Sequence, residues 1–377
     1  MSTMTLPSAL DQLDFIVSEE QQQLRDLVRR FLDDHYPMPR IRHLMTTPTG
    51  HDAGLWQRMA EETGLTGLLI PEEFGGSGLG IADAQIVAEE MGRTLFNGPF
   101  LSSAIISVLT LLECGDQTIQ KRILPVIADG SRILTVAGLE YGSNPAKAIN
   151  DGNTVQLTGE FNTIPDGHIA DHLIVPASAE DKTNLYLIAG NAPGLKTSSP
   201  PMFDQTRRFA EITLTETPAI QIGSPCDGDR ILERVRDRVL TILAAETSGA
   251  AQACMDMAVA YAKERYQFGR PIGSFQAIKH KCADMLLLIE EARSATAYAG
   301  ACAGEAIEEL PIAAAMAKAR CTEAFAKIAD ETLQIHGGMG FTWDHDCHLF
   351  LKRAKSSEIF LGSPVSHRQR LAGMLEI

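Results

Sequence analysis

Residues 264–284 have the sequence ERYQFGRPIGSFQAIKHKCAD, and apolar residues recur at helical spacing on both sides of this stretch. The upstream pattern predicts a long helix that is buried on one face as far as Phe268. Gly269 can adopt the left-handed conformation that ends a helix, and Pro271 cannot continue one. A second helix is expected from about Ser274. The stretch therefore predicts two long antiparallel helices joined by an Arg-x-Gln-Phe-Gly corner.

The corner resembles a signature of the flavin-dependent acyl-CoA dehydrogenases, Glu-Arg-x-Gln-Phe-Gly-x-x-Ile-x-x-Phe-Gln. In that family, four residues of the signature contact the ADP half of an FAD that is bound mainly by a neighbouring subunit. The resemblance assigns these contacts to Arg265, Gln267, Phe268 and Gln276. A guanidinium group suits a pyrophosphate, and an aromatic ring packs on adenine. An arginine in the last turn of a helix is otherwise a surface cation that compensates the helix dipole, but the whole motif in register favours the cofactor.

A second motif supports the same resemblance. A helix expected from Pro311 ends in Gln-Ile-His-Gly-Gly-Met-Gly-Phe at residues 334–341, which is similar to the family's Gln-x-x-Gly-Gly-x-Gly-Phe. In the family this motif lets the backbone approach the FAD pyrophosphate, so the resemblance adds Gln334, Gly337 and Gly338 to the expected contacts. Taken alone, two glycines after a helix are usually only a cap.

The composition excludes several classes of partner. A chain of 377 residues with 45% hydrophobic and 21% charged residues is expected to form two or three domains. Its net charge of -15 argues against nucleic acid or an anionic membrane surface as a partner. Seven cysteines without a Cys-x-x-Cys pair suggest free thiols in a reducing compartment. Residues 1–14 do not resemble a secretory signal, and the apolar run near residues 100–112 is too short to span a bilayer. We therefore expect a cytoplasmic protein.

The hydrophobic period changes twice along the chain. Residues 18–125 have helical patterns, with helices expected from Ser18 to about Asp34, from Gly54 to Glu62 and from Ile81 to Arg93. Short β-type runs follow, at residues 133–137, 154–157, 172–175, 185–188 and 209–214. We expect a mostly α protein with an inserted β domain, the acyl-CoA dehydrogenase-like fold. It has an N-terminal helical domain over residues 1–128, a middle β-barrel or sandwich over 129–226, and a C-terminal four-helix bundle domain over 227–377.

The residues that supply the catalytic base in the family are missing. The segment 352–363 aligns with the family's Arg-Asp-Ala-Arg…Ile-Tyr-Glu-Gly-Thr and places Leu361 where the catalytic glutamate usually stands. Some members carry the base 26 residues before the corner arginine, and this position is Val239. Neither side chain can remove a proton from the α-carbon of a thioester. Glu246, the nearest carboxylate on the buried stripe, is a weak candidate base, and a structural ion pair is the more common role for such an acid.

The motifs that hold the flavin ring also differ from the family. Residues 139–144, LEYGSN, replace Thr-Glu-Pro-x-x-Gly-Ser-Asp and are two residues shorter. Residues 163–166, TIPD, replace Trp-Ile-Thr-Asn, so the ring-stacking tryptophan and the flavin-contacting threonine are absent. Pro165 has no backbone donor. We expect the middle domain of this chain to be a poor site for its own flavin ring.

Other polar residues predict no further site. His336, His345 and His348 imply no ligand geometry, so no metal is expected. Lys352, Arg353 and Lys355 are expected on a solvated face or at a subunit contact.

Three classes of function remain open. The chain resembles the base-lacking subunit of α2β2 enzymes that act on CoA thioesters of sterol or bile-acid side chains. Its partners would then be an acyl-CoA substrate, a base-carrying acyl-CoA dehydrogenase subunit, and electron-transfer flavoprotein or a similar acceptor. The second class is a self-sufficient homomeric dehydrogenase with Glu246 or water as base, or a flavin oxidase or monooxygenase of the same fold. The third is a non-enzymatic assembly subunit.

Overall fold

The computed structural model describes residues 17–150, 154–179 and 182–377. The first 14 residues, for which no secretory signal was expected, lie outside these ranges, as does the start of the predicted N-terminal domain. Within the described ranges, no helix is both long enough and apolar enough to cross a membrane.

The N-terminal part is helical, as predicted. The helices are α1 (Glu19–His35), α2 (Met38–Met45), α3 (Ala53–Thr63), α4 (Ile81–Arg93), α5 (Val108–Cys114) and α6 (Gln117–Ala128), and a π-helical segment (Phe100–Ser107) leads into α5. Ser18 caps α1 through a capping box with Gln21. The sequence did not predict α2, which is only 8 residues long and begins at Met38, directly after Pro37.

The middle part is a β structure that closes on itself. Its strands are β1 (Leu134–Val136), β2 (Ala146–Asn150), β3 (Val155–Pro165), β4 (His172–Ala179), β5 (Lys182–Ala189), β6 (Leu195–Ser198) and β7 (Phe209–Ile222). The sheet runs β1-β4-β2-β3-β7-β5, and β5 also pairs with β4, which closes the ring. The sequence missed β2 and β6 because their side chains are mostly exposed and form no apolar run.

Five helices follow the barrel: α7 (Gly228–Glu264), α8 (Gln276–Glu305), α9 (Leu310–His336), α10 (Cys347–Ile359) and α11 (Pro364–Met374). The predicted end of the first long helix was wrong. Helix α7 ends at Glu264, and Phe268 lies in a hairpin between β8 (Tyr266–Gln267) and β9 (Arg270–Pro271). Phe268 is 92% exposed. Gly269 does not end the helix, because it and Phe268 form the hairpin turn with φ of 79° and 54°.

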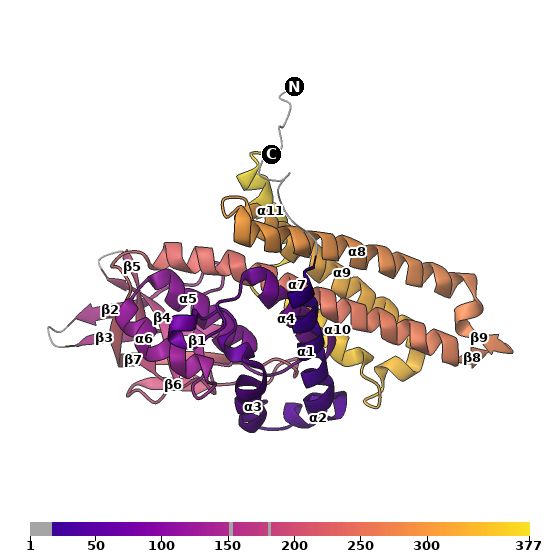
Figure 1. Cartoon of the computed structure of the whole chain (residues 1–377), viewed down its shortest axis with the longest axis horizontal. Coiled ribbons are helices and arrows are strands. Elements are labelled where there is room, and N and C mark those ends of the chain that lie inside the picture. The colour runs from indigo at the N-terminus through magenta and orange to yellow at the C-terminus, as the bar shows by residue number, and fades with distance from the viewer. Residues whose placement is uncertain (1–16, 151–153, 180–181) are drawn as a thin grey trace.

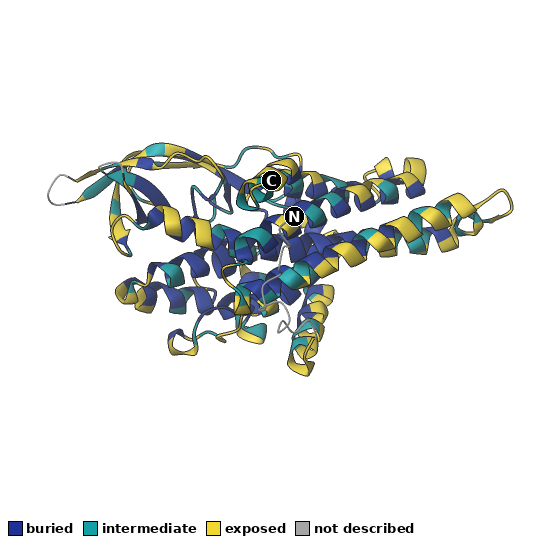
Figure 2. Cartoon of the chain, turned by 90° about the horizontal axis from the view of Figure 1, so that it is seen from above, coloured by how far each residue is buried: buried dark blue, intermediate teal, exposed yellow. Residues whose placement is uncertain are grey.

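Helix α7 lies at the centre of the molecule. Figure 1 shows the barrel at one end of α7 and the β8–β9 hairpin at the other, with α8 running beside α7. Buried residues gather where α7 meets its neighbours, and the hairpin end of α7 and α8 is largely exposed (Figure 2).

Two glycines let α4 and α7 approach closely. A Cβ on Gly92 would lie 1.9 Å from the carbonyl oxygen of Glu246, and one on Gly249 would lie 1.9 Å from that of Glu89.

This close crossing predicts a large effect of one added methyl group. Gly249→Ala should destabilise the fold by about 1–3 kcal/mol, because backbone atoms of α4 have to move. Gly304→Ala is the matched control, since its Cβ meets nothing within 4 Å, and it should be neutral or stabilising by up to about 1 kcal/mol. Urea unfolding of both variants measures the difference. Equal midpoints would show that the crossing is not tight.

Candidate functional site

The corner between α7 and α8 is a short hairpin with exposed polar side chains. The Ile272 N–H donates to the Arg265 carbonyl oxygen at 2.8 Å. This backbone bond closes the hairpin and leaves the side chains of Arg265, Gln267, Phe268 and Gln276 exposed. Among the described residues, no carboxylate pairs with the Arg265 guanidinium. The corner therefore presents a cation, two amides and an aromatic ring to whatever covers this end of the bundle.

The end of α9 lies at the same end of the molecule as the corner. The ring of Tyr261, one turn before Arg265, stacks on the His336 ring with centroids 4.2 Å apart. His336 directly precedes Gly337, and the exposed Gln334 lies in the last turn of the same helix. A Cβ on Gly337 or Gly338 would meet no atom within 4 Å. The Gly337 N–H itself caps α9 by donating to the Leu333 and Gln334 carbonyl oxygens, so the fit to a diphosphate ligand depends on the open space and on the Arg265 guanidinium. We call these seven residues the cofactor half-site: Arg265, Gln267, Phe268, Gln276, Gln334, Gly337 and Gly338.

The two positions where the family carries its base are apolar and fully buried. Leu361 and Val239 are both 0% exposed. Leu361 has φ of 55°, and the His367 Nε2–H donates to its carbonyl oxygen at 2.9 Å. The Lys318 ammonium secures the same turn by donating to the Ser357 and Gly362 carbonyl oxygens at 2.6 and 3.2 Å. Neither side chain can accept a proton, although the Glu140 carboxylate lies beside the turn and accepts from the Leu361 N–H at 3.5 Å.

Glu246 lies in a buried ion cluster. Arg207 donates to both of its carboxylate oxygens, and Arg353 Nη1 donates to Oε1 at 2.6 Å. Burial by itself raises the pKa of Glu246, but the two guanidinium groups outweigh burial and the net pKa lies below its usual value. A general base needs a pKa near the working pH. Glu246 is therefore held as an ionised structural partner.

The expectation for Arg353 was wrong, because this residue is 1% exposed and does not lie on a solvated face. Its Nε donates to Asp204 Oδ2 at 3.1 Å and to Thr206 Oγ1 at 3.0 Å, and its Nη2 donates to the Thr206 carbonyl oxygen at 2.7 Å. We call Asp204, Arg207, Glu246 and Arg353 the buried ion cluster. One feature of the sequence indicated that this position is unusual: Arg353 aligns with the aspartate of the family's Arg-Asp-Ala-Arg.

The positions that hold a flavin ring in the family are occupied by this chain's own contacts. Asp166 accepts a hydrogen bond from Ser102 Oγ at 2.6 Å, and burial raises its pKa. Tyr141, in the shortened segment, lies beside the Arg236 guanidinium, with 4.3 Å from CZ to the ring centroid. Its ring also meets the His367 ring edge-on at 5.7 Å. The Tyr141 and His367 rings therefore lie beside the turn at Leu361 and Gly362.

A small cavity remains beside Glu246, between α4, the π-helical segment and α7. Its lining includes Met91, Asn97, Asp166 and Glu246, and water-sized spheres can occupy about 40 Å³ of it. A single water needs about 10–15 Å³ on this measure, whereas sites for small ligands are typically several hundred Å³ in size. The cavity can hold a few waters and no acyl chain.

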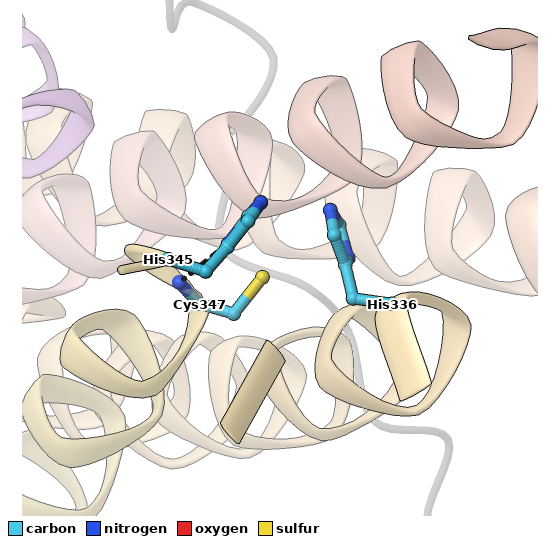
Figure 3. A group of neighbouring side chains, drawn as sticks. All are labelled: His336, His345 and Cys347. Carbon is cyan, nitrogen blue, oxygen red and sulfur yellow. Dashed lines mark hydrogen bonds between the residues drawn. The ribbon is translucent and has the colours of Figure 1, made fainter. Parts of the chain in front are cut away.

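The predicted histidines divide into two groups. His336 and His345 lie together with Cys347 (Figure 3), and their donor atoms are within 4.8 Å of one another. His348 is separate and meets the Trp343 ring edge-on at 4.7 Å. Nothing in the spacing of these residues indicated that Cys347 would join the first group.

Comparison with known proteins gives a consistent assignment over most of the chain. The acyl-CoA dehydrogenase N-terminal domain family matches residues 18–131, and the acyl-CoA dehydrogenase C-terminal domain family matches residues 238–375. The chain is 34% identical over 356 residues to acyl-CoA dehydrogenase IpdE2 of Mycolicibacterium smegmatis, covering 94% of this chain and 98% of that protein.

Two solved structures have a similar fold. A variant of the Tcur3481-Tcur3483 steroid ACAD is 31% identical, with a TM-score of 0.87, and covers 96% of this chain and 99% of its own. A chain of the ChsE4-ChsE5 complex from Mycobacterium tuberculosis is 26% identical, with a TM-score of 0.89, and covers 97% of this chain and 99% of its own.

The buried ion cluster predicts that Glu246→Gln acts on stability. The substitution leaves Arg207 and Arg353 without their shared carboxylate, which typically costs about 3–5 kcal/mol. Glu290→Gln is the control, because Glu290 pairs with Arg293 on the surface and should cost less than about 1 kcal/mol. Urea unfolding at neutral pH measures both variants. Equal losses of stability in the two variants would show that Glu246 has no special structural role.

The same cluster predicts an acid-dependent loss of stability. The folded-state pKa of Glu246 lies below its ordinary value of 4.5, so its ionisation stabilises the fold fully above that pH. This contribution is lost as the pH falls through the folded-state pKa. Between pH 7 and pH 3, the free energy of unfolding of the wild type should therefore fall more than that of Glu246→Gln. Parallel pH profiles of the two proteins would contradict this prediction.

Proposed function

Because this chain belongs to the acyl-CoA dehydrogenase family, we propose that it is the base-lacking subunit of a heteromeric FAD-dependent enzyme and completes its partner's cofactor site. Members of this family are flavoproteins that use FAD. The proposal divides the two tasks of the active site between unlike subunits. This chain contributes binding groups, and the partner contributes the base and the surroundings of the flavin ring.

The observation that carries the proposal is the absence of a carboxylate at both positions where the family carries its base. Leu361 and Val239 occupy both family positions, and Glu246 is ionised and held by two arginines. General base catalysis typically contributes about 10²- to 10⁴-fold to a rate, so we infer that a chain without a carboxylate at the family's base positions does not desaturate an acyl-CoA at a useful rate. The small cavity beside Glu246 supports the same conclusion, since it has no room for an acyl chain.

The cofactor half-site supports a binding role. Bound FAD supplies the electron acceptor for formation of the α,β double bond. The exposed Arg265 guanidinium and the open backbone at Gly337 and Gly338 fit its pyrophosphate, and the exposed Phe268 ring offers a face to adenine. Because these groups are exposed at the end of the bundle and this chain lacks the family's ring-holding tryptophan and threonine, we infer that they reach the FAD of a neighbouring subunit.

The relatives support a substrate class and an assembly. One similar structure is a steroid ACAD and another is a complex of two named proteins, so we infer a CoA thioester of a sterol or bile-acid side chain and an α2β2 tetramer. Electron-transfer flavoprotein or a similar carrier would accept the electrons. The seven cysteines are free, which supports a reducing, cytoplasmic location.

Removal of the half-site cation tests cofactor binding. Arg265→Ala should weaken FAD retention in the assembled complex by roughly 10- to 100-fold, because a hydrogen bond to a charged group contributes about 1.5–3 kcal/mol. Folding should be nearly unchanged. Arg58→Ala is the control, since Arg58 is an exposed arginine on α3 that pairs with Glu62. Flavin absorbance after gel filtration measures retention, and unchanged FAD content in Arg265→Ala would contradict the proposal.

Purification of the chain alone and with its partner tests the division of labour. The chain alone should retain little FAD and show no acyl-CoA dehydrogenase activity, whereas the co-purified complex should be a flavoprotein tetramer by analytical ultracentrifugation. Stoichiometric FAD and turnover on the lone chain would favour a homomeric enzyme. A complex without FAD would favour an assembly subunit.

Glutamate variants of the complex then locate the base. Replacing the partner's glutamate should abolish turnover with FAD still bound. If Glu246→Gln abolishes turnover while the partner's variant remains active, the base belongs to this chain.

A further inference from the structure

Four side chains with nitrogen or sulfur donors meet where α7, α9 and α10 come together. We call them the soft-metal cluster: Met257, His336, His345 and Cys347. The donor atoms of the two histidines and Cys347 all lie within 4.8 Å of one another (Figure 3). Cys347 Sγ also lies 3.4 Å from Met257 Sδ. Ligands of a tetrahedral metal, at about 2.0–2.1 Å for nitrogen and about 2.3 Å for sulfur, are separated by about 3.5 Å. A movement of about 1 Å would bring the donors of His336, His345 and Cys347 to such spacings, and Met257 Sδ already lies at this distance from Cys347 Sγ.

His336 is oriented as a ligand. Its Nδ1–H donates to the Thr332 carbonyl oxygen at 2.7 Å, so the lone pair is on Nε2. The side chain is buried at 3% exposure, and Nε2 has no hydrogen-bond partner among the described residues. Metal-bound histidines typically donate their other ring N–H to a carbonyl or carboxylate in this way. The stacked Tyr261 ring fixes the imidazole plane. A buried acceptor without a partner is otherwise destabilising.

We propose that the soft-metal cluster binds one Cu(I) ion. A thiolate, a thioether and two imidazoles are soft or intermediate ligands, and thiolate with thioether favours Cu(I) over harder cations. Binding replaces the Sγ–H bond of Cys347 with an Sγ–Cu bond and releases one proton to solvent, with no change in the oxidation state of copper.

His345 is the ligand that has to adjust. Its Nδ1 accepts a hydrogen bond from the Cys347 N–H at 3.3 Å, so its other nitrogen carries the hydrogen. The side chain is only partly buried, and rotation of the imidazole can present a lone pair to the metal. His348 is not part of the site, because its ring meets Trp343.

The position of the cluster suggests what the metal does. Met257 belongs to α7, His336 ends α9, and Cys347 begins α10. Between the last two residues lies the turn Gly337–Phe341, which contains both glycines of the cofactor half-site. A metal at the cluster would clamp this turn to α7. The metal site does not depend on the proposed function.

Anaerobic titration of the full chain with Cu(I), in competition with bicinchoninate, tests the proposal. We expect one equivalent of Cu(I) per chain. Cys347→Ser and His336→Gln should each weaken binding by at least roughly 100-fold, since even outer-shell partners typically contribute about 10- to 100-fold. Met257→Leu, which is close in volume, should weaken Cu(I) binding by at least about tenfold and leave Zn(II) binding unchanged.

The controls separate loss of a ligand from loss of the fold. His348→Gln changes the residue next to Cys347 and should keep full Cu(I) affinity. Each variant should keep the wild-type thermal unfolding midpoint before metal is added. Absence of stoichiometric Cu(I) binding, or equal affinity in Cys347→Ser and the wild type, would overturn the proposal. Zn(II) binding as tight as Cu(I) binding would overturn the choice of copper.

Discussion

A guanidinium group removed from water has to recover its hydrogen bonds from the protein, and Arg353 recovers them from all three parts of the chain. Its partners are Glu246 on α7, Asp204 and Thr206 in the segment before β7, and the Phe96 carbonyl oxygen after α4. Arg207 adds a second cation, and Glu246 and Asp204 balance the two positive charges. A buried charge without its partner is strongly destabilising. The relative placement of barrel, N-terminal helices and C-terminal helices therefore depends on this cluster being complete.

Two members of the same cluster, Arg207 and Glu246, line the small cavity described above. Charged side chains bound to one another cannot provide the apolar walls typical of ligand pockets, and the remaining cavity is a few waters in size. Leu361 is fully buried, and the Tyr141 and His367 rings lie beside the adjacent Gly362. The cluster that stabilises the fold therefore also limits the free volume beside Glu246.

The hairpin end of the C-terminal helices, by contrast, is exposed to solvent. The α7–α8 hairpin exposes a cation and aromatic rings, and the end of α9 exposes glycine backbone. Tyr261 and His336 connect these two surfaces, and the soft-metal cluster lies directly behind them. The ion-cluster end of the chain is consequently buried and charge-paired, whereas the hairpin end exposes polar side chains and open backbone.

The sequence alone determined what depends on local order. The corner motif, the two glycines after α9 and the apolar residues at the base positions can be read directly, and capping with helical periodicity predicted α1 and α4 at nearly their observed bounds. Tertiary structure decided the rest. Helix α7 ends at Glu264 because the backbone beyond it forms the hydrogen bonds of a hairpin. The apolar periodicity of the sequence does not predict this end. Arg353 is buried, and Met257 meets Cys347, because helices distant in sequence pack together. Local patterns specify which face of a helix is apolar, but not which partner will cover a charge or complete a set of ligands.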